Sequence, residues 1–343
     1  MTAATLPRYA HLVALSDRIG LFEHALYTVP RPANGYCVDD VARGVVVLCR
    51  ADPSGTLAQL AWAYLRFVRE SQQPDGRVVN RCDTDGVRHG VPGVEDCWGR
   101  ALWGLGTAAS RGRDPELARR ALAGFELSAG LRSPWPHAMA FAGLGAAEVL
   151  RVDSGHEQAQ SLLADAARAV SARPDVAGRA GHPSWPWPQP RLTYANAVIP
   201  DVLLAAGTSL GDASLVDDGL ALLDWLLTVE SQPGHLSVTP AGGWAPGEPR
   251  PGFDQQPIEV STLADACARA FELTGDPRWS RGVELAAGWF FGANDTATRL
   301  ADPVTGGCCD GLQREGRNEN QGAESTLALV STLQHAQRLA LLP

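Results

Sequence analysis

Carboxylic acids recur in this sequence where a polar loop runs into a helix rich in small apolar residues. Asp39 and Asp40 stand in YCVDDVARGVVVL (36–48), and Glu259 and Glu324 stand near the starts of two further segments of this kind. Two carboxyl groups can share proton transfer, one protonating a leaving oxygen while the other activates water. We therefore predict Asp40, Glu259 and Glu324 as the catalytic acid and base candidates.

Each of these acids also has a structural explanation. A carboxylate at a helix start caps free backbone N–H groups, but two adjacent residues cannot both fill one cap, so this accounts for only one of Asp39 and Asp40. Glu259 also fits a capping role at the start of its helix. Glu324 is harder to explain in this way, because it stands in the otherwise apolar run AESTLALV. Both explanations stay open for Asp39, Asp40 and Glu259.

Aromatic and amide side chains accompany the acids. Trp98 follows Glu95 and Asp96 in VEDCWGRALWG, and Trp185 and Trp187 stand in the proline-stiffened segment HPSWPWPQP. An indole at a cavity mouth offers an apolar face to a sugar ring, although a single tryptophan is more often part of the core. Amides and carboxylates orient hydroxyl-rich ligands through paired donors and acceptors. The expected substrate-binding residues are Asp39, Glu95, Asp96, Trp98, Trp185, Trp187, Tyr194, Asn196, Gln256, Asp310, Asn320 and Gln321.

The composition excludes other chemistries. All 29 basic residues are arginine, so the chain has no lysine for a Schiff base or for a phosphate-binding loop. A net charge of −9 without a basic stripe argues against a nucleic-acid partner. We expect a small molecule or an oligosaccharide as the substrate.

Metal sites and targeting segments leave recognisable spacings, and this sequence lacks them. The seven cysteines form no C-x-x-C pair, and the eight histidines form no H-x-x-x-H pair. We therefore expect neither a metal nor a cofactor. The first residues lack the charged and apolar regions of a signal peptide, and no run of eighteen apolar residues occurs. We expect a cytoplasmic protein without a membrane partner.

Two kinds of helix alternate along the chain and would position these residues. The apolar kind, suited to burial on all sides, is expected in 36–48, 93–106, 133–150, 192–207, 255–271 and 318–333. The amphipathic kind is expected at 8–19, 58–72, 114–128, 155–172, 212–230 and 276–291. Asp before Pro at two of these starts gives a helix cap followed by proline in the first turn. The alternation predicts an all-α (α/α)₆ toroid, a single domain over 1–343, with the acids around one mouth.

Several stretches also carry a family resemblance. They are HALYTVPRPANGYCVDDVAR (24–43), EDCWGRALWGLG (95–106), FDQQPIE (253–259), TGDPRW (274–279), DPVTGGCCDGL (302–312) and NENQGAESTL (318–327). Through them the sequence resembles a bacterial helical-toroid family that is often fused to glycosyltransferases. The resemblance implies the six-hairpin toroid of many glycosidases and sugar epimerases, and it suggests a separate glycosyltransferase as a partner.

One stretch departs from that family. Its members read approximately W-x-W-F-E-D-x-L-T-Y-D-N-A before the fourth apolar helix, whereas this chain has WPWPQPRLTYANA. Gln189, Pro190 and Ala195 thus replace acidic residues. If those acids take part in the family's reaction, this chain has lost that reaction or redirected it.

The leading hypothesis from the sequence is a carbohydrate-active enzyme, specifically a glycoside hydrolase that uses a carboxylic acid and a carboxylate. Two alternatives stay open. One is a sugar-binding relative that no longer hydrolyses its ligand. The other is an enzyme of specialised metabolism that cyclises or isomerises a largely apolar substrate.

Overall fold

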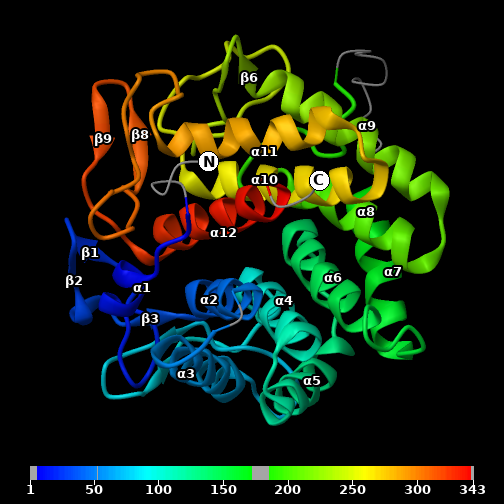
Figure 1. Cartoon of the computed structure of the whole chain (residues 1–343). Coiled ribbons are helices and arrows are strands. Elements are labelled where there is room, and N and C mark those ends of the chain that lie inside the picture. The colour runs from blue at the N-terminus through cyan, green and yellow to red at the C-terminus, as the bar shows by residue number, and fades with distance from the viewer. Residues whose placement is uncertain (1–5, 52, 172–184, 341–343) are drawn as a thin grey trace.

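Six helices form an inner ring in the computed structural model, which describes residues 6–51, 53–171 and 185–340. They are α2 (Val38–Arg50), α4 (Asp96–Arg111), α6 (Pro136–Leu150), α8 (Val198–Leu210), α10 (Pro257–Thr274) and α12 (Ala323–Ala340). Each contacts its two neighbours, and α12 contacts α2, which closes the ring (Figure 1). The six segments predicted to be buried on all sides are these six helices.

Small residues let the inner helices pack closely. A Cβ atom on Gly99 of α4 would come within 2.2 Å of the Ala138 carbonyl oxygen in α6. A Cβ atom on Gly106 would come within 2.1 Å of the Gly145 carbonyl oxygen. Since real atoms do not approach so closely, any larger residue would force the two backbones apart. The glycines of the apolar pattern therefore set the spacing of this part of the ring.

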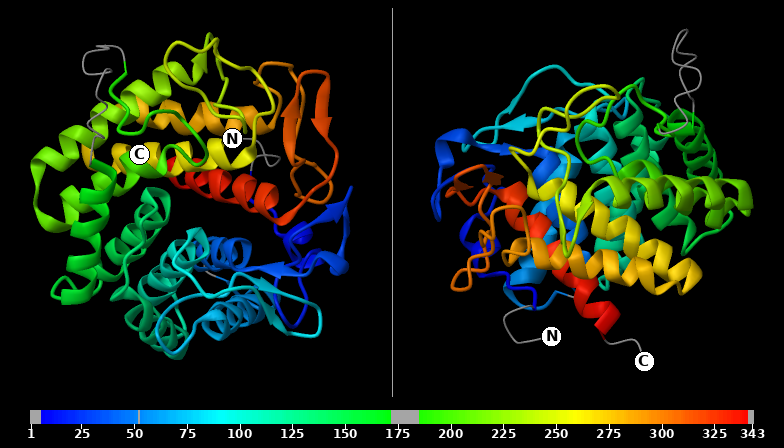
Figure 2. Two further views of the ribbon diagram at one scale, coloured as in Figure 1. Left: turned by 180° about the vertical axis from the view of Figure 1, so that it is seen from behind. Right: turned by 90° about the horizontal axis from the view of Figure 1, so that it is seen from above.

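The remaining helices lie outside this ring, as Figures 1 and 2 show. They are α1 (Ala10–Ala14), α3 (Thr56–Ser71), α5 (Pro115–Ala129), α7 (Glu157–Ser171), α9 (Ala213–Val229) and α11 (Pro277–Phe290). Asp114, Asp212 and Asp276 cap three of them by accepting backbone N–H groups of the first turn. The described residues thus form twelve α-helices in two rings, and the predicted (α/α)₆ toroid is confirmed.

The first outer helix is shorter than predicted, since α1 ends at Ala14 rather than near residue 19. The Asp17 carboxylate accepts the backbone N–H groups of Ile19 and Gly20, and Ser16 bonds back to the Leu12 carbonyl. Such local side-chain bonds compete with helical hydrogen bonds and favour a turn.

Short strands lie within the loops, and they were not predicted from the sequence. They form the hairpins β1 (Ala25–Leu26) with β2 (Val29–Pro30), β6 (Ser231–Gln232) with β7 (His235–Leu236), and β8 (Gly311–Gln313) with β9 (Gly316–Asn318), and the sheet β3 (Tyr36–Cys37), β4 (Arg81–Cys82) and β5 (Arg88–His89). A 3₁₀ turn spans Pro32–Asn34. Strand β3 leads directly into α2, so the sheet fixes the start of that helix. Among the described residues, no helix combines the length and hydrophobicity that crossing a bilayer requires.

Candidate functional site

The first turns of four inner helices converge at one end of the ring. Asp40 of α2 and Glu324 of α12, predicted from different parts of the sequence, line one cavity of about 280 Å³. Its wall also holds Glu23, Cys37, Asp39, Arg43, Arg100, Gln256 and Asp310. Three predicted binding residues, Asp39, Gln256 and Asp310, thus lie with two of the three catalytic candidates. We call this the front cavity.

Arg43 joins the two catalytic candidates of the front cavity. Its Nη1 donates to Asp40 Oδ1 at 2.6 Å, and its Nη2 donates to Glu324 Oε2 at 2.7 Å. Cys37 donates its thiol to the other oxygen of Asp40 at 3.2 Å. Burial raises the pKa of Asp40 to about 7, although Arg43 opposes the shift. Asp40 is therefore a carboxyl group that gains and loses a proton near neutral pH.

A second arginine organises the neighbouring acids. Arg100 of α4 donates to Asp39 Oδ1 at 2.6 Å and lies 3.3 Å from Asp96. Burial disfavours the charge on Asp39, but Arg100 and Arg43 hold the pKa of Asp39 below its usual value. Tyr194 donates its hydroxyl to Asp96 at 2.7 Å. Asp39 is thus ionised at neutral pH, whereas the neighbouring Asp40 exchanges its proton there.

The sequence analysis missed both arginines, although the sequence carries a signal for them. Asp39 and Arg43 are four residues apart, as are Asp96 and Arg100, and residues at that spacing lie on one face of a helix. The same D-x-x-x-R pattern therefore marks two helices whose first turns form the site.

Asp96 lines a second, more apolar cavity of about 620 Å³, and its partner Arg100 lines the front cavity. Trp135, His137 and Tyr194 line the second cavity, together with the predicted Glu95 and the substituted Gln189. The ring of Tyr194 stacks on His137 with 4.6 Å between centroids, and burial lowers the pKa of His137 to about 4. His137 is therefore neutral at physiological pH. We call this the side cavity.

Glu259 lies at the same end of the ring but lines neither cavity. Its carboxylate accepts the backbone N–H groups of Ala195 and Asn196, and the Asn196 side-chain amide at 3.1 Å. Only 3% of Glu259 is exposed, and burial raises its pKa to about 8. The carboxyl group thus holds the loop before α8 in this structure, and a catalytic role for Glu259 stays a prediction.

The tryptophans do not form the expected platform for a sugar ring. Trp98 is fully buried, and Trp187 is 4% exposed and stacks on Trp225. Trp185 packs edge-on against Trp225 and Trp244. Trp98 and Trp187 belong to the core and Trp185 packs against it, so none of the three lines the front cavity or the side cavity. The exposed tryptophan at the side cavity is Trp135, at 58%.

Three predicted amide residues support loops rather than reach the cavities. Asn196 is fully buried against Glu259, and Asn320 accepts the backbone N–H of Tyr27. The side chain of Gln321 donates to Asp302 at 3.2 Å. The polar composition of 318–321 therefore reflects the packing of this loop against the first hairpin, and the substrate contacts expected of Asn320 and Gln321 stay predictions.

Ala195 occupies an unusual backbone position. Its φ angle is +47°, in the left-handed region that asparagine and aspartate tolerate better than alanine. An aspartate would suit this backbone better than the alanine that the chain carries.

One group of potential metal ligands exists at the front cavity. Ligand atoms of Glu23, Cys37 and Asp40 lie within 4.8 Å of one another. Arg81 and Arg43 already neutralise the two carboxyl groups, and burial raises the pKa of the Cys37 thiol well above its usual value. A protonated thiol and two arginine-paired acids are a poor ligand set for a cation.

The chain matches no protein-family model and no curated protein sequence. Its fold is similar to solved structures across nearly the whole chain. A sugar epimerase from a ruminal bacterium is 12% identical with a TM-score of 0.72, covering 96% of this chain and 95% of that one. Cellobiose 2-epimerase from Bacillus thermoamylovorans is 10% identical with a TM-score of 0.71, covering 97% and 96%. A cellulase of C. cellulolyticum in complex with cellobiose is 8% identical with a TM-score of 0.61, covering 94% and 88%. The chain therefore has the (α/α)₆ toroid fold of these enzymes.

Proposed function

We propose that this protein is a carbohydrate-active enzyme that isomerises or epimerises a sugar by proton transfer at the front cavity, with Asp40 as the general acid–base. The observation that supports it is a buried carboxyl group, at a polar cavity wall, whose pKa lies near 7. A general base or acid works best when its pKa is close to the ambient pH.

The reaction would move one proton and return it. Asp40 takes the proton from the carbon next to the sugar carbonyl, and the electron pair of that C–H bond moves onto the carbonyl oxygen. The guanidinium groups of Arg43 and Arg100 stabilise the resulting enediolate anion. Return of the proton to the neighbouring carbon, with the hydroxyl proton moving between the two enediolate oxygens, gives the isomer, whereas a proton added to the opposite face of the same carbon gives the epimer; no other reactant is consumed.

The other polar groups of the front cavity suit the hydroxyl groups of a sugar. Glu324 and Asp310 supply acceptors, and Gln256 supplies both a donor and an acceptor. A cavity of about 280 Å³ fits one sugar ring better than a polymer. The side cavity would then take a second ring or another substituent.

Glycoside hydrolysis is the second candidate, and one observation favours it. Asp40 and Glu324 line the same cavity. The pKa of Asp40 lies near neutrality, and the carboxylate of Glu324 lies beside the guanidinium group of Arg43. Hydrolysis, however, passes through a cation-like transition state. Two arginines at the cavity wall suit an anionic intermediate better than a cation-like transition state. We therefore propose isomerisation ahead of hydrolysis.

The resemblance to the solved epimerases lends the proposal further support. The match covers 95% and 96% of the two epimerase chains, at higher TM-scores than the cellulase match. The separate glycosyltransferase partner stays a prediction.

Turnover in D₂O separates the candidates. The purified protein is incubated in D₂O with reducing monosaccharides and disaccharides, and the products are examined by NMR and mass spectrometry. Isomerisation or epimerisation replaces the hydrogen next to the carbonyl by deuterium, whereas hydrolysis releases new reducing ends without such exchange. Binding without either change would identify a sugar-binding protein and overturn the proposal.

A variant pair attributes the activity to Asp40. Asp40→Asn keeps the shape of the side chain but cannot exchange a proton, and we expect turnover to fall about 10²–10⁴-fold. Asp85→Asn changes an exposed acid outside both cavities and serves as the matched control. Full activity of Asp40→Asn would exclude this carboxyl group as the acid–base.

A further inference from the structure

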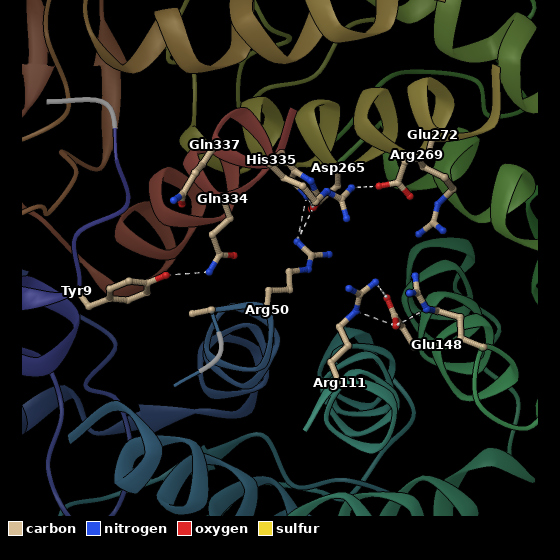
Figure 3. Close-up of a pocket in the computed structure, with 13 residues that line it drawn as sticks. Tyr9, Arg50, Arg111, Glu148, Asp265, Arg269, Glu272, Gln334, His335 and Gln337 are labelled. Carbon is tan, nitrogen blue, oxygen red and sulfur yellow. Dashed lines mark hydrogen bonds and ion pairs between the residues drawn. The ribbon is translucent and has the colours of Figure 1, made fainter. Parts of the chain in front are cut away.

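The last turns of the inner helices surround another polar cavity, at the opposite end of the ring from the front cavity. It has a volume of about 290 Å³, and among the described residues five arginines line it. They are Arg50 of α2, Arg111 of α4, Arg151 directly after α6, Arg269 of α10 and Arg338 of α12. Figure 3 shows the guanidinium groups of Arg50, Arg111 and Arg269 entering the same space. We call this the rear cavity.

Carboxylates hold these arginines from the outside. Arg50 donates through Nη1 to Asp265 at 2.7 Å, and Arg111 donates through Nε and Nη2 to Glu148 at 3.0 Å. Arg269 donates through Nε to Asp201, a buried acid behind the cavity wall. Among the described residues, these bonds leave the second terminal nitrogen of Arg50 and both terminal nitrogens of Arg269 for a ligand. The guanidinium groups of Arg50 and Arg269 are thus held in place and still have N–H donors that could bind a ligand.

The rear cavity has more positive than negative groups. Five arginines and three acids, Glu148, Asp265 and Glu272, line it among the described residues, an excess of two positive charges. Asp201 behind Arg269 reduces the excess to one. Burial, and then the nearby Arg50, Arg111 and Arg151, lower the pKa of Arg338. The arginines therefore repel one another across the open space.

Helix geometry accounts for each arginine but not for their convergence. The carboxyl end of a helix carries partial negative charge and attracts a cation, so an arginine in the last turn is favourable. Arginines directed outward to solvent would interact with the helix ends equally well. In the part of the chain that the structure describes, five guanidinium groups around one space that holds only three acids leave a positive charge, which an anion in the cavity would neutralise.

We propose that the rear cavity binds a phosphate-bearing anion, either free phosphate or the phosphoryl group of a small metabolite. The planar forks of arginine match the oxygen spacing of phosphate and bind it through paired hydrogen bonds. An anion there would link α2, α4, α10 and α12, which also carry Asp40, Asp96, Glu259 and Glu324 at their other ends. This inference stands on the rear cavity alone and does not rest on the proposed function.

Thermal unfolding and calorimetry of the full chain test the proposal. The probes are inorganic phosphate, inorganic pyrophosphate and glucose 6-phosphate, each compared with sodium chloride at equal ionic strength. A ligand that binds only the folded state raises the melting temperature in a saturable manner. We expect this for at least one probe, and stronger binding of glucose 6-phosphate than of inorganic phosphate would identify a sugar phosphate as the source. The absence of a saturable shift with all three probes would overturn the proposal.

Arginine variants place the binding. Arg151→Gln and Arg338→Gln remove half-exposed side chains without leaving a fully buried acid unpaired, so both should fold. Each should weaken binding about tenfold, because each removes one of the positive charges that line the cavity. Arg281→Gln on the outer helix α11 is the matched control and should bind like the wild type. If both rear variants bind like the wild type, or if Arg43→Gln alone weakens binding, the rear cavity is not the site.

Discussion

The two ends of the inner ring use the same residue types in opposite order. At the front, acids stand in the first turns of the helices, as with Asp40 and Asp96, and an arginine follows one turn later. At the rear, arginines stand in or near the last turns or directly after them, and the acids that hold them lie one turn earlier or on another inner helix. Both orders follow the helix dipole, which favours anions at the amino end and cations at the carboxyl end.

The comparison teaches that helix direction alone gives the two ends opposite character. Because all six inner helices present their amino ends to the front, acids accumulate there, and burial can raise the pKa of one of them. Arginines accumulate at the rear, where their positive charges exceed the negative ones. One end is therefore suited to proton transfer and the other to binding an anion.

The largest expected effect is on stability at the rear. Asp265→Asn leaves Arg50 without its buried partner, and we expect the free energy of unfolding to fall by about 3–5 kcal/mol. Arg50 and His335 hold the pKa of Asp265 below its ordinary 3.8 against the effect of burial. The difference between wild type and variant should thus be full above pH 3.8 and shrink as the pH falls further.

Urea unfolding at several pH values measures this difference. Glu284→Gln removes one partner of the exposed pair with Arg281 and should cost less than about 1 kcal/mol. Equal losses in the two variants would show that the rear cluster is no more than a set of surface pairs.

The next effect concerns activity at the front. Arg43→Gln removes the donor between Asp40 and Glu324, and we expect turnover to fall about 10²–10³-fold. Since Arg43 opposes the rise in the pKa of Asp40, its loss should raise that pKa above the present value of about 7. The pH at which turnover is half-maximal on the acid side should therefore move upward. A fall in rate without that movement would show that Arg43 does not set the proton affinity of Asp40.

A smaller effect separates Glu259 from the acid–base groups. Its pKa is about 8 in the folded chain against 4.5 ordinarily, so its contribution to stability is present below pH 4.5 and lost as the pH rises to about 8. Glu259→Gln should flatten this dependence and cost about 1–3 kcal/mol through the disturbed bonds to Ala195 and Asn196.

Activity of the same variant decides between a positioning role and proton transfer. We expect Glu259→Gln to lose much less turnover than Asp40→Asn and to keep the pH profile of the wild type. A loss of the full 10²-fold scale of a general acid or base, in a variant that remains folded, would return Glu259 to the catalytic candidates.

The smallest effect tests whether the side cavity holds a second ring. Trp135→Ala removes the exposed indole there, and we expect the binding of a disaccharide to weaken by about 1 kcal/mol. A monosaccharide confined to the front cavity should bind as before, which makes it the internal control. Calorimetry with both sugars measures the difference. Equal weakening would mean that Trp135 acts on the whole site.

Placement of residues was predictable where a local rule acts. The Asp–Pro starts of α5 and α11 follow from hydrogen bonds within one turn, and both appear as expected. Asp40 and Glu324 were likewise expected at helix starts around one mouth, and both line the front cavity.

The residues that were expected at the cavity but lie elsewhere in the structure share one physical reason. An inner helix is apolar on all sides, so its sequence has no stripe to show which way a given residue points. Trp98 and Glu259 both begin such helices, and only contacts with residues far along the chain place one in the core and the other under Ala195. Trp187 was misplaced for a related reason, since its partner Trp225 is distant in sequence.

The sequence by itself determined the toroid, because helix periodicity, small-residue composition and capping are local properties that repeat along the chain. It also indicated that acids gather at the amino ends of the inner helices. Only the tertiary structure decided that Arg43 joins Asp40 to Glu324, 281 residues apart, and that burial brings the pKa of Asp40 near 7. Proton affinity depends on the solvent and charges around a group, and closure of the ring creates those surroundings.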